Sequence, residues 1–534
     1  MQRGWRSSRV RLGVVGVVTA LVAVACGSSS SGGSGGTGSG GGGGTNSNAS
    51  VVMGTTDTIV SADPAGSYDL PSWTLQYNVY QTLLQVPPGT SDIAPEAANC
   101  DFHGKTTYVC TLVPGQAFSN GDPVTADDVV YSFNRVNKIH DPSGPWALLA
   151  SMKNVTASGN TVTFTLNAPD ATWPYILTTA AGSIVDKKVF PANKLLADDK
   201  VVGSGPYMLS NYTPNQLAEF TPNPHYGGSD HLNNSKFVVK YEQDASTLVS
   251  DAQSGAVDIA YRTLSPTQLS ALKGSNGITL QQGKGIEIRY MVFNQKLQPG
   301  TNDAQRLAIR QAAAQLVDRS TIASQVYRGT VIPLYSIVPQ GLNGATDGLK
   351  TAYGADPSVD KAKATLAAAG VTTPVSMTLW YNVNHYNDAD LATELMRQLN
   401  ASGLFNVKLQ TSEWATYDDA ALDDKYGVFL FGWFPDYPDA DDYTAPFFPC
   451  KTAFLNDHYC NPKVDDLITA EKAQTDKTKR LQDFAQMQDL LAQDVPVIPI
   501  WQGGQVAAVQ AGVTGVASTL DPSYTFRFWL VGKS

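Results

Sequence analysis

The sequence predicts a mixed α/β protein built from two or three lobes. Segments with strand-like and helix-like patterning alternate along the chain, which is typical of α/β folds. The body from residue 51 to residue 534 is too long for one hydrophobic core. Its composition is ordinary for a globular protein, with 42% hydrophobic and 16% charged residues. We therefore expect several packed lobes, and we find no internal repeat.

Polar and apolar periodicities locate individual elements. Thr125 and Asp128 have the spacing of a capping box, with Asp in place of Glu, and predict that a helix begins there. Residues 161–166 alternate polar and apolar side chains, which predicts a strand. Apolar stripes at helical spacing predict two later helices, over residues 388–402 and 478–493.

Three further segments are less regular. Residues 304–327 predict a long helix that residues 318–320 break. Residues 427–431 and 495–501 are apolar and short, and predict buried strands.

The chain begins with the pattern of a bacterial export signal, residues 1–25. Arginines precede an apolar run that is shorter than the roughly 20 residues of a membrane span. Small residues lead directly to Cys26, which resembles a lipobox, although Ala23 stands where leucine is usual. We expect Cys26 to be lipidated; plain secretion with cleavage nearby is the alternative. Residues 26–50 then form a lipidated cysteine and a Gly/Ser-rich flexible tether.

Four further cysteines form two close pairs in the sequence. An even count in an exported chain indicates disulfides. Three connectivities are possible, and we expect the local one, Cys100 with Cys110 and Cys450 with Cys460. A four-cysteine metal site is disfavoured because no Cys-x-x-Cys spacing is present.

The charge and the motifs disfavour several classes of function. A net charge of −10 argues against binding to nucleic acid. Ser270 and Lys273 match Ser-x-x-Lys, but Lys451-Thr452 is not followed by the glycine of the partner motif. The body has no Gly-x-Ser-x-Gly or His-Glu-x-x-His motif, and the six histidines are scattered. We predict that the chain is not an enzyme and needs no cofactor or metal.

Several blocks, in the same order, are similar to the peptide/nickel/oligopeptide-binding proteins of ABC importers, solute-binding protein family 5. The blocks are residues 107–130, Gly203–Tyr207, Asn223–Gly228, Phe293-Asn294 with Arg310–Ala312, and Gly432–Tyr437. The resemblance covers nearly the whole body of the chain.

This resemblance implies a two-lobed, periplasmic-binding-protein-like clamp of type II with an additional inserted domain. The main lobe would comprise residues 51–86, 203–285 and 495–534. The inserted domain would comprise residues 87–202, and the second lobe residues 286–494. Two crossing segments would act as a hinge, with ligand bound between the lobes.

The resemblance also singles out candidate ligand-binding residues. The Asp that matches Asp436 meets the α-ammonium of the ligand in peptide-binding relatives, and a carboxylate in a closed cleft suits that cation. Trp433 and Tyr437 flank it in the same segment, and Trp73 matches a cleft position of the main lobe. The neighbouring acidic residues 439–442 read as a solvated loop, and membership of such a loop is the alternative for Asp436.

The other end of the ligand is less defined. Dipeptide binders of this family use an arginine before the helix that begins near Asp388, and none is present here. His385 resembles a cleft histidine of oligopeptide binders, although a surface histidine is the alternative. A neutral histidine holds a carboxylate less firmly than arginine does. We therefore expect oligopeptides rather than dipeptides. Trp414 reads as a supporting residue.

These observations predict a monomeric, lipid-anchored receptor on the outer face of the cytoplasmic membrane. It would bind peptides and deliver them to ABC permease and ATPase subunits. Receptors of the same fold for a nickel chelate, haem or an oligosaccharide are the first alternative, since fold does not fix the ligand. A secreted hydrolase or an adhesin is the alternative of another class.

Overall fold

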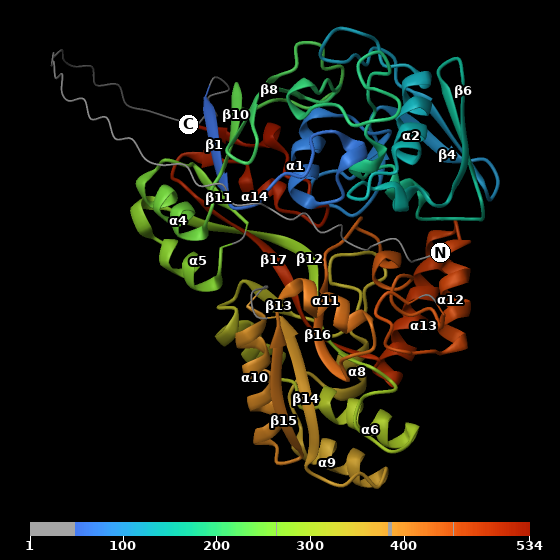
Figure 1. Cartoon of the computed structure of the whole chain (residues 1–534), viewed down its shortest axis with the longest axis vertical. Coiled ribbons are helices and arrows are strands. Elements are labelled where there is room, and N and C mark those ends of the chain that lie inside the picture. The colour runs from blue at the N-terminus through green and yellow to red at the C-terminus, as the bar shows by residue number, and fades with distance from the viewer. Residues whose placement is uncertain (1–48, 263, 383–386, 452) are drawn as a thin grey trace, which may run out of the picture. The chain divides into compact units, whose positions relative to one another are not determined.

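A sheet of eleven strands runs through most of the chain in the computed structural model, which describes residues 49–262, 264–382, 387–451 and 453–534. The strand order is β15-β14-β16-β12-β17-β11-β1-β10-β9-β8, and β13 also pairs with β17 (Figure 1). The strands are β1 Ser50–Thr55, β8 Tyr207–Thr213, β9 Leu217–Pro222, β10 Lys236–Tyr241, β11 Ile259–Tyr261, β12 Thr279–Phe293, β13 Val331–Pro333, β14 Val375–Asn382, β15 Phe405–Ser412, β16 Val428–Trp433 and β17 Val497–Val509.

Strands β12 and β17 belong to both halves of this sheet. The end of β17 pairs with β11, whereas the second half of β12 pairs with β16. The two strands pair with each other antiparallel, but their register shifts between Lys284 and Ile288. Figure 1 shows them crossing together from β1 and β11 to β14 and β16. They are the two crossing segments expected from the sequence, and their hinge motion stays a prediction.

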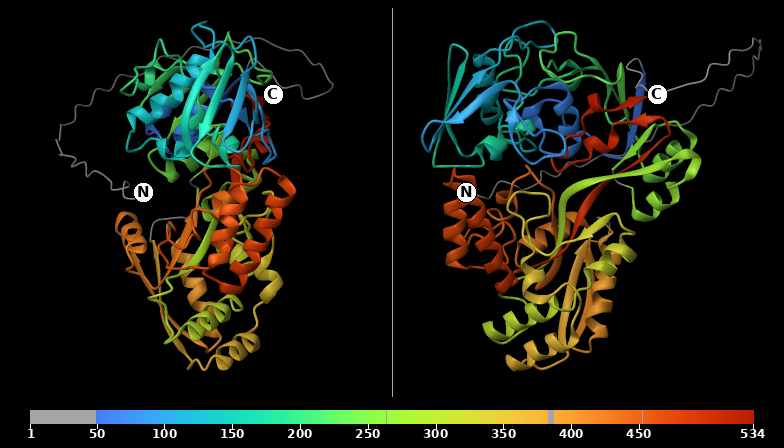
Figure 2. Two further views of the ribbon diagram at one scale, coloured as in Figure 1. Left: turned by 90° about the vertical axis from the view of Figure 1, so that its right-hand side faces the viewer. Right: turned by 180° about the vertical axis from the view of Figure 1, so that it is seen from behind.

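A separate four-stranded sheet has the order β4-β5-β7-β6. Its strands are β4 Ala98–Phe102, β5 Thr107–Leu112, β6 Met152–Ser158 and β7 Thr161–Leu166, and α2 (Ala126–Ile139) lies against it (Figure 2). The predicted strand 161–166 is confirmed, with its apolar side chains buried. The capping box is also confirmed, because Thr125 and Asp128 each accept the backbone N–H of the other. These two local signals fix where β7 and α2 begin.

The helices follow most of the sequence predictions. The predicted helices 388–402 and 478–493 correspond to α10 and α13, and the predicted strands 427–431 and 495–501 to β16 and the longer β17. The remaining helices and short strands are α1 Leu70–Val79, α3 Trp173–Ile176, α4 Ala245–Ser254, α5 Pro266–Leu272, α6 Asp303–Ala314, α7 Arg319–Thr321, α8 Gly348–Tyr353, α9 Val359–Ala368, α10 Asp388–Ala401, α11 Trp414–Leu422, α12 Pro462–Lys472, α13 Lys477–Asp494, α14 Val516–Thr519, β2 Leu84–Gln85, β3 Ala94–Pro95, β18 Val513–Thr514 and β19 Gly532–Lys533.

The helix predicted from residue 304 is confirmed over Asp303–Ala314, but the predicted position of its break is wrong. Helix α6 ends at Ala314, earlier than the predicted break. The Asp318 side chain then accepts the Thr321 N–H at 2.9 Å and caps a new turn, because a short carboxylate satisfies free N–H groups at a helix start. A π-helical turn, Ile322–Val326, completes the segment.

Separate hydrophobic cores lie on the two halves of the large sheet. On the β1 and β10 half, Phe237 stacks on Phe528 with ring centroids 4.0 Å apart. On the β14–β16 half, α10 buries Leu391, Leu395 and Leu399. The four-stranded sheet has its own aromatic core. The exact domain boundaries expected from the sequence stay predictions.

The structure joins Cys100 to Cys110 and Cys450 to Cys460, which is the expected local pairing. Cys26, the signal segment and the tether up to residue 48 lie outside the described residues. The predicted end of the tether at residue 50 is wrong, because Ser50 is already the first residue of β1 and pairs with Lys236. Within the part of the chain that the structure describes, no helix combines the length and the apolar character that crossing a membrane requires.

Candidate binding site

The segment after β16 places Asp436 in a tight arrangement with Asp442. The backbone N–H of Asp436 donates to Asp442 Oδ2 at 2.9 Å, and the indole N–H of Trp433 donates to the same oxygen at 3.0 Å. Asp442 therefore fixes both residues from the inside of the turn. Burial raises the pKa of Asp442 well above its usual range, and the neighbouring Asp436 carboxylate adds to the rise.

Asp436 also contacts the other half of the fold. The Tyr68 hydroxyl, just before α1, donates a short hydrogen bond to the Asp436 carboxylate. Burial raises the pKa of Asp436 to about 6, and this hydrogen bond opposes the rise. Tyr68 packs edge-to-face on Trp73, with ring centroids 5.6 Å apart. Three predicted site residues, Asp436, Trp433 and Trp73, are thus gathered around Tyr68 and Asp442.

Tyr437 takes part in a different set of contacts. Its hydroxyl donates to Asp441 Oδ2 at 3.0 Å, and its ring stacks on Tyr175 with centroids 6.1 Å apart. The ring packs against the core of the four-stranded sheet. Tyr437 therefore braces the segment that carries Asp436. The other predicted residue, His385, lies outside the described residues.

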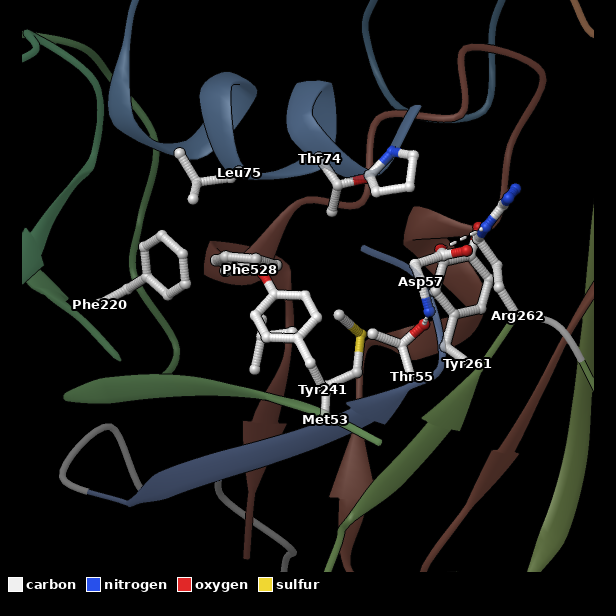
Figure 3. A pocket seen from close by; sticks show the side chains of 12 residues that line it. Met53, Thr55, Asp57, Thr74, Leu75, Phe220, Tyr241, Tyr261, Arg262 and Phe528 are labelled. Carbon is white, nitrogen blue, oxygen red and sulfur yellow. Dashed lines mark hydrogen bonds and ion pairs between the residues drawn. The ribbon is translucent and has the colours of Figure 1, made fainter. Parts of the chain in front are cut away.

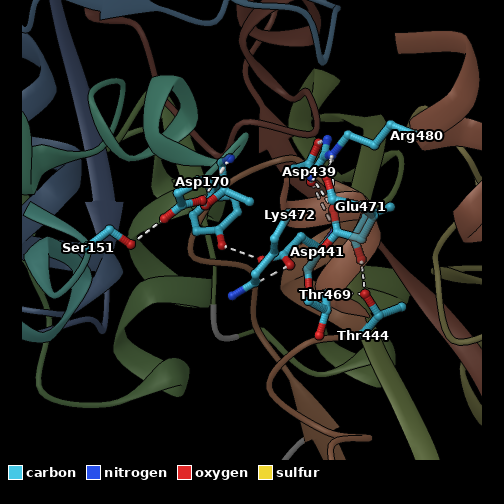
Figure 4. A network of polar contacts seen from close by, with 12 residues as sticks. Ser151, Asp170, Asp439, Asp441, Thr444, Thr469, Glu471, Lys472 and Arg480 are labelled. Carbon is cyan, nitrogen blue, oxygen red and sulfur yellow. Dashed lines mark hydrogen bonds and ion pairs between the residues drawn. The ribbon is translucent and has the colours of Figure 1, made fainter. Parts of the chain in front are cut away.

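The expectation of a solvated acidic loop is wrong. Asp439, Asp441 and Asp442 are only 4%, 2% and 1% exposed. Arg480 of α13 holds Asp439 through two hydrogen bonds of 2.6 and 2.7 Å, and it also contacts Glu471 at 2.9 Å (Figure 4). Buried carboxylates require such partners.

This buried acidic network (Asp439, Asp441, Glu471, Lys472 and Arg480) lies against the four-stranded-sheet region. The backbone N–H of Ala171 donates to the carbonyl of Lys472 at 2.8 Å. The Lys472 ammonium lies 3.8 Å from Asp441, and burial together with Asp441 raises the pKa of Glu471. The network therefore joins two sequence-distant parts of the fold behind Tyr437 and Asp436.

A second charged group lies on β12 and α10. The Arg289 guanidinium lies 3.6 Å from Glu287 and 3.5 Å from Asp388, and its centre is 5.6 Å from the Trp501 ring. Arg289 is paired across the sheet with Gly432, and its Nη1 occupies the space of a side chain there, 1.5 Å from an ideal Cβ. Burial raises the pKa of Asp388 to about 6 and also raises the pKa of Glu287.

A cavity of about 30 Å³ adjoins this charged group. Its lining consists of Arg289, Asp388, Trp414, Tyr417, Leu430, Phe431 and Gly432. Its volume holds about one or two water molecules. The Trp414 side chain, 44% exposed, belongs to this lining, and the supporting role expected from the sequence stays a prediction.

Another cavity, of about 20 Å³, lies under α1 and is mostly apolar (Figure 3). Asp57 and Arg262, which line it, form an ion pair of 2.8 Å. The lining includes neither Asp436 nor Asp388. This cavity is too small for a peptide, and we assign it no role.

Sequence reasoning missed Tyr68, Asp442, Glu287, Arg289 and Asp388. One signal was available for two of them. Glu287 and Arg289 are charged residues inside the otherwise apolar run 286–293, and charges in a buried strand indicate a specific partner or role. Tyr68 and Asp442 had no local signal, since their partners are distant in the sequence.

The two halves of the sheet, joined by β12 and β17 and bridged at Tyr68 and Asp436, define a two-lobed binding clamp. The family model described as "Bacterial extracellular solute-binding proteins, family 5 Middle" matches residues 102–454. The chain belongs to this family.

Similar proteins include two with curated names. The probable D,D-dipeptide-binding periplasmic protein DdpA of Escherichia coli K12 is 29% identical over 472 residues, covering 85% of this chain and 88% of its own. The periplasmic oligopeptide-binding protein OppA of Haemophilus influenzae is 24% identical, over 86% of this chain and 89% of its own.

Solved structures show the same fold. The E. coli murein tripeptide binding protein MppA has a TM-score of 0.70 at 21% identity, covering 92% of this chain and 99% of its own. The Helicobacter pylori protein DppA, in complex with peptide STSA, has a TM-score of 0.72 at 21% identity, covering 91% and 98%.

Proposed function

We propose that this chain is the receptor of an ABC importer for peptides and that it captures them between its two lobes. The observation that carries this proposal is the partly buried Asp436 carboxylate, held by Tyr68 of one half and by the Asp442 turn of the other. The names of the relatives, which include dipeptide-binding and oligopeptide-binding proteins, support the choice of peptides.

Asp436 suits the α-ammonium of a peptide. An ammonium donates charge-assisted hydrogen bonds to a carboxylate, and these are stronger than neutral ones in a poorly hydrated cleft. Trp433 and Trp73 would then form apolar walls on either side of the first peptide residue. The ammonium would replace the Tyr68 hydroxyl as the main donor to Asp436.

We favour oligopeptides over dipeptides. The segment before α10 has no arginine to fix the carboxylate of a short ligand, and His385 is the proposed partner there. Backbone hydrogen bonds and hydrated side-chain pockets would permit varied sequences. Affinity in the micromolar range, about −8 kcal/mol, is expected for a receptor of this kind.

We further propose that Cys26 carries the lipid anchor and that the receptor works as a monomer outside the cytoplasmic membrane. It would pass peptides to permease and ATPase subunits without cleaving them. Metabolic labelling with a palmitate analogue tests the anchor, with Cys26→Ala as the unlabelled control.

Isothermal titration with di- to pentapeptides tests the function. Binding is expected with free N-termini and is lost on N-acetylation. Asp436→Asn should weaken binding by several kcal/mol, because the ligand cation is left without its partner. The control Asp303→Asn changes a fully exposed carboxylate and should have no effect. Equal affinity for acetylated peptides, or no heat with any peptide, contradicts the proposal.

Haem is the second candidate ligand, since a relative 25% identical to this chain is named heme-binding protein A. Mass spectrometry of ligand copurified with the protein separates the two candidates. A peptide returned uncleaved after incubation removes the hydrolase alternative.

A further inference from the structure

The charged side chains at β12 and α10 alternate in sign, in the order Glu287, Arg289 and Asp388. Arg289 lies between Glu287 and Asp388, at distances longer than hydrogen bonds on both sides. Its guanidinium centre also lies 5.6 Å from the Trp501 ring, and its Nη1 donates to the carbonyl of Ile288 at 3.3 Å. Arg289 therefore has anchors that do not depend on Asp388.

Carboxylates outnumber cations around this part of the fold. Glu287 and Asp388 both form ion pairs with Arg289. Asp436 and Asp442 are neighbours, since the backbone N–H of Asp436 donates to the Asp442 carboxylate. Arg262, the other arginine nearby, forms an ion pair with Asp57. An α-ammonium at Asp436 would balance one negative charge. Glu287, Arg289 and Asp388 together would keep their excess negative charge, and this charge would repel a further anion.

The cavity beside Asp388 has the features of a site for a small cation. Asp388 is 3% exposed, and its Oδ1, which lies 3.5 Å from Arg289 Nε, accepts no closer hydrogen bond among the described residues. Trp414 and Tyr417 line the same cavity, and aromatic faces attract cations. The volume of about 30 Å³ suits an ammonium group, which is about as large as a water molecule.

We infer that this cavity binds the side-chain ammonium of a lysine-type residue in the captured peptide, with Asp388 as its partner and Trp414 against it. The inference rests on the proposed function and adds a preference for basic peptides. The order of charges then becomes Glu287, Arg289, Asp388 and ligand, so that each cation has an anion beside it.

Titration calorimetry with trialanine-based peptides tests the inference. Lysine is placed at each position in turn and compared with norleucine, which has a similar side chain without the charge. At one position lysine should bind at least about tenfold more tightly than norleucine, a difference of about 1.4 kcal/mol. Asp388→Asn should bring this ratio close to one, by weakening the binding of the lysine peptide more than that of the norleucine peptide.

Two variants control for folding. Asp388→Glu keeps the charge and should retain a preference for lysine. Asp390→Asn removes an exposed carboxylate from the same helix and should change nothing. The wild-type comparison stands even where Asp388→Asn does not fold.

The inference is overturned when lysine and norleucine bind equally at every position, or when Asp388→Asn keeps the preference. Tighter binding of glutamate than glutamine peptides also overturns it and assigns the cavity to a carboxylate at Arg289. These outcomes differ from failure of the proposed function, in which no peptide of the series binds, trialanine included.

Discussion

Replacing Gly432 by alanine should destabilise the protein strongly, because the Arg289 side chain occupies the space that the new methyl group needs. An ideal Cβ at this position lies 1.5 Å from Nη1, 2.4 Å from Cζ of Arg289, and 2.8 Å from the carbonyl oxygen of Ile288. Ordinary contacts between such atoms are about 3.5–4.0 Å. The guanidinium therefore has to move by about 2 Å.

That movement separates buried charges. Arg289 is 4% exposed and lies between Glu287 and Asp388. Breaking a buried ion pair costs about 3–5 kcal/mol, and overpacking a core costs about 1–3 kcal/mol. We expect Gly432→Ala to lower the free energy of unfolding by about 3 kcal/mol, measured by urea denaturation with a fluorescence readout.

The matched control is Gly503→Ala in β17. The nearest atoms to a Cβ there are 3.3 Å away on Trp501 and 3.6 Å away on Glu287, so a loss below about 1 kcal/mol is expected. In a double-mutant cycle, Arg289→Met should remove most of the additional cost of Gly432→Ala, because the obstacle is gone. Strict additivity, or a loss below about 1 kcal/mol for Gly432→Ala itself, would refute this reasoning.

Three further predictions concern charged groups. Because the Asp436 pKa is raised to about 6 from 3.8, the unliganded carboxyl carries a proton at acidic pH. Peptide affinity should therefore fall as pH drops below about 6, by up to about tenfold per pH unit. Calorimetric titration near pH 6 in buffers of different ionisation enthalpy should show that peptide binding releases a proton, and Asp436→Asn should abolish this release. By the same shift, this residue's contribution to the free energy of unfolding should decrease as pH rises from about 4 to about 6, since the folded state binds the proton more tightly. Arg480→Met should lower the free energy of unfolding by about 3–5 kcal/mol, because Asp439 and Glu471 lose a buried partner. The control Lys477→Met breaks only an exposed pair with Asp92 and should change this free energy by less than about 1 kcal/mol. Equal effects of the two variants in urea denaturation would contradict the assigned role of the network.

Local patterns in the sequence predicted much of the secondary structure. The alternation in residues 161–166 and the capping box at Thr125 depend on neighbours within a few residues, and both are confirmed. The break predicted at residues 318–320 was misplaced, because α6 already ends at Ala314 and Asp318 caps the start of the next helical turn. Apolar periodicity indicates which face of a helix is buried, but it does not indicate where the backbone hydrogen bonds of the helix end.

The charged groups show what local reasoning lacks. In the sequence, the acidic residues after Asp436 resemble a solvated loop. In the fold, α13 places Arg480 beside Asp439, and the two side chains are hydrogen-bonded. Likewise, Gly432 looks like part of a family motif, but the fold shows that Arg289 fills its side-chain space. Both features depend on pairs of residues far apart in the sequence, which composition and spacing do not connect.

The contacts behind Tyr437 restrict how the clamp can open. Ala171 is hydrogen-bonded to Lys472, Asp92 is paired with Lys477, and Tyr175 is stacked on Tyr437. A rotation about β12 and β17 that moves α12 and α13 therefore either breaks all three contacts or carries the four-stranded-sheet region along. In the second case that region and the β14–β16 half would turn as one rigid body, and the strain of opening would fall on the chain segments that join the region to β1 and β8.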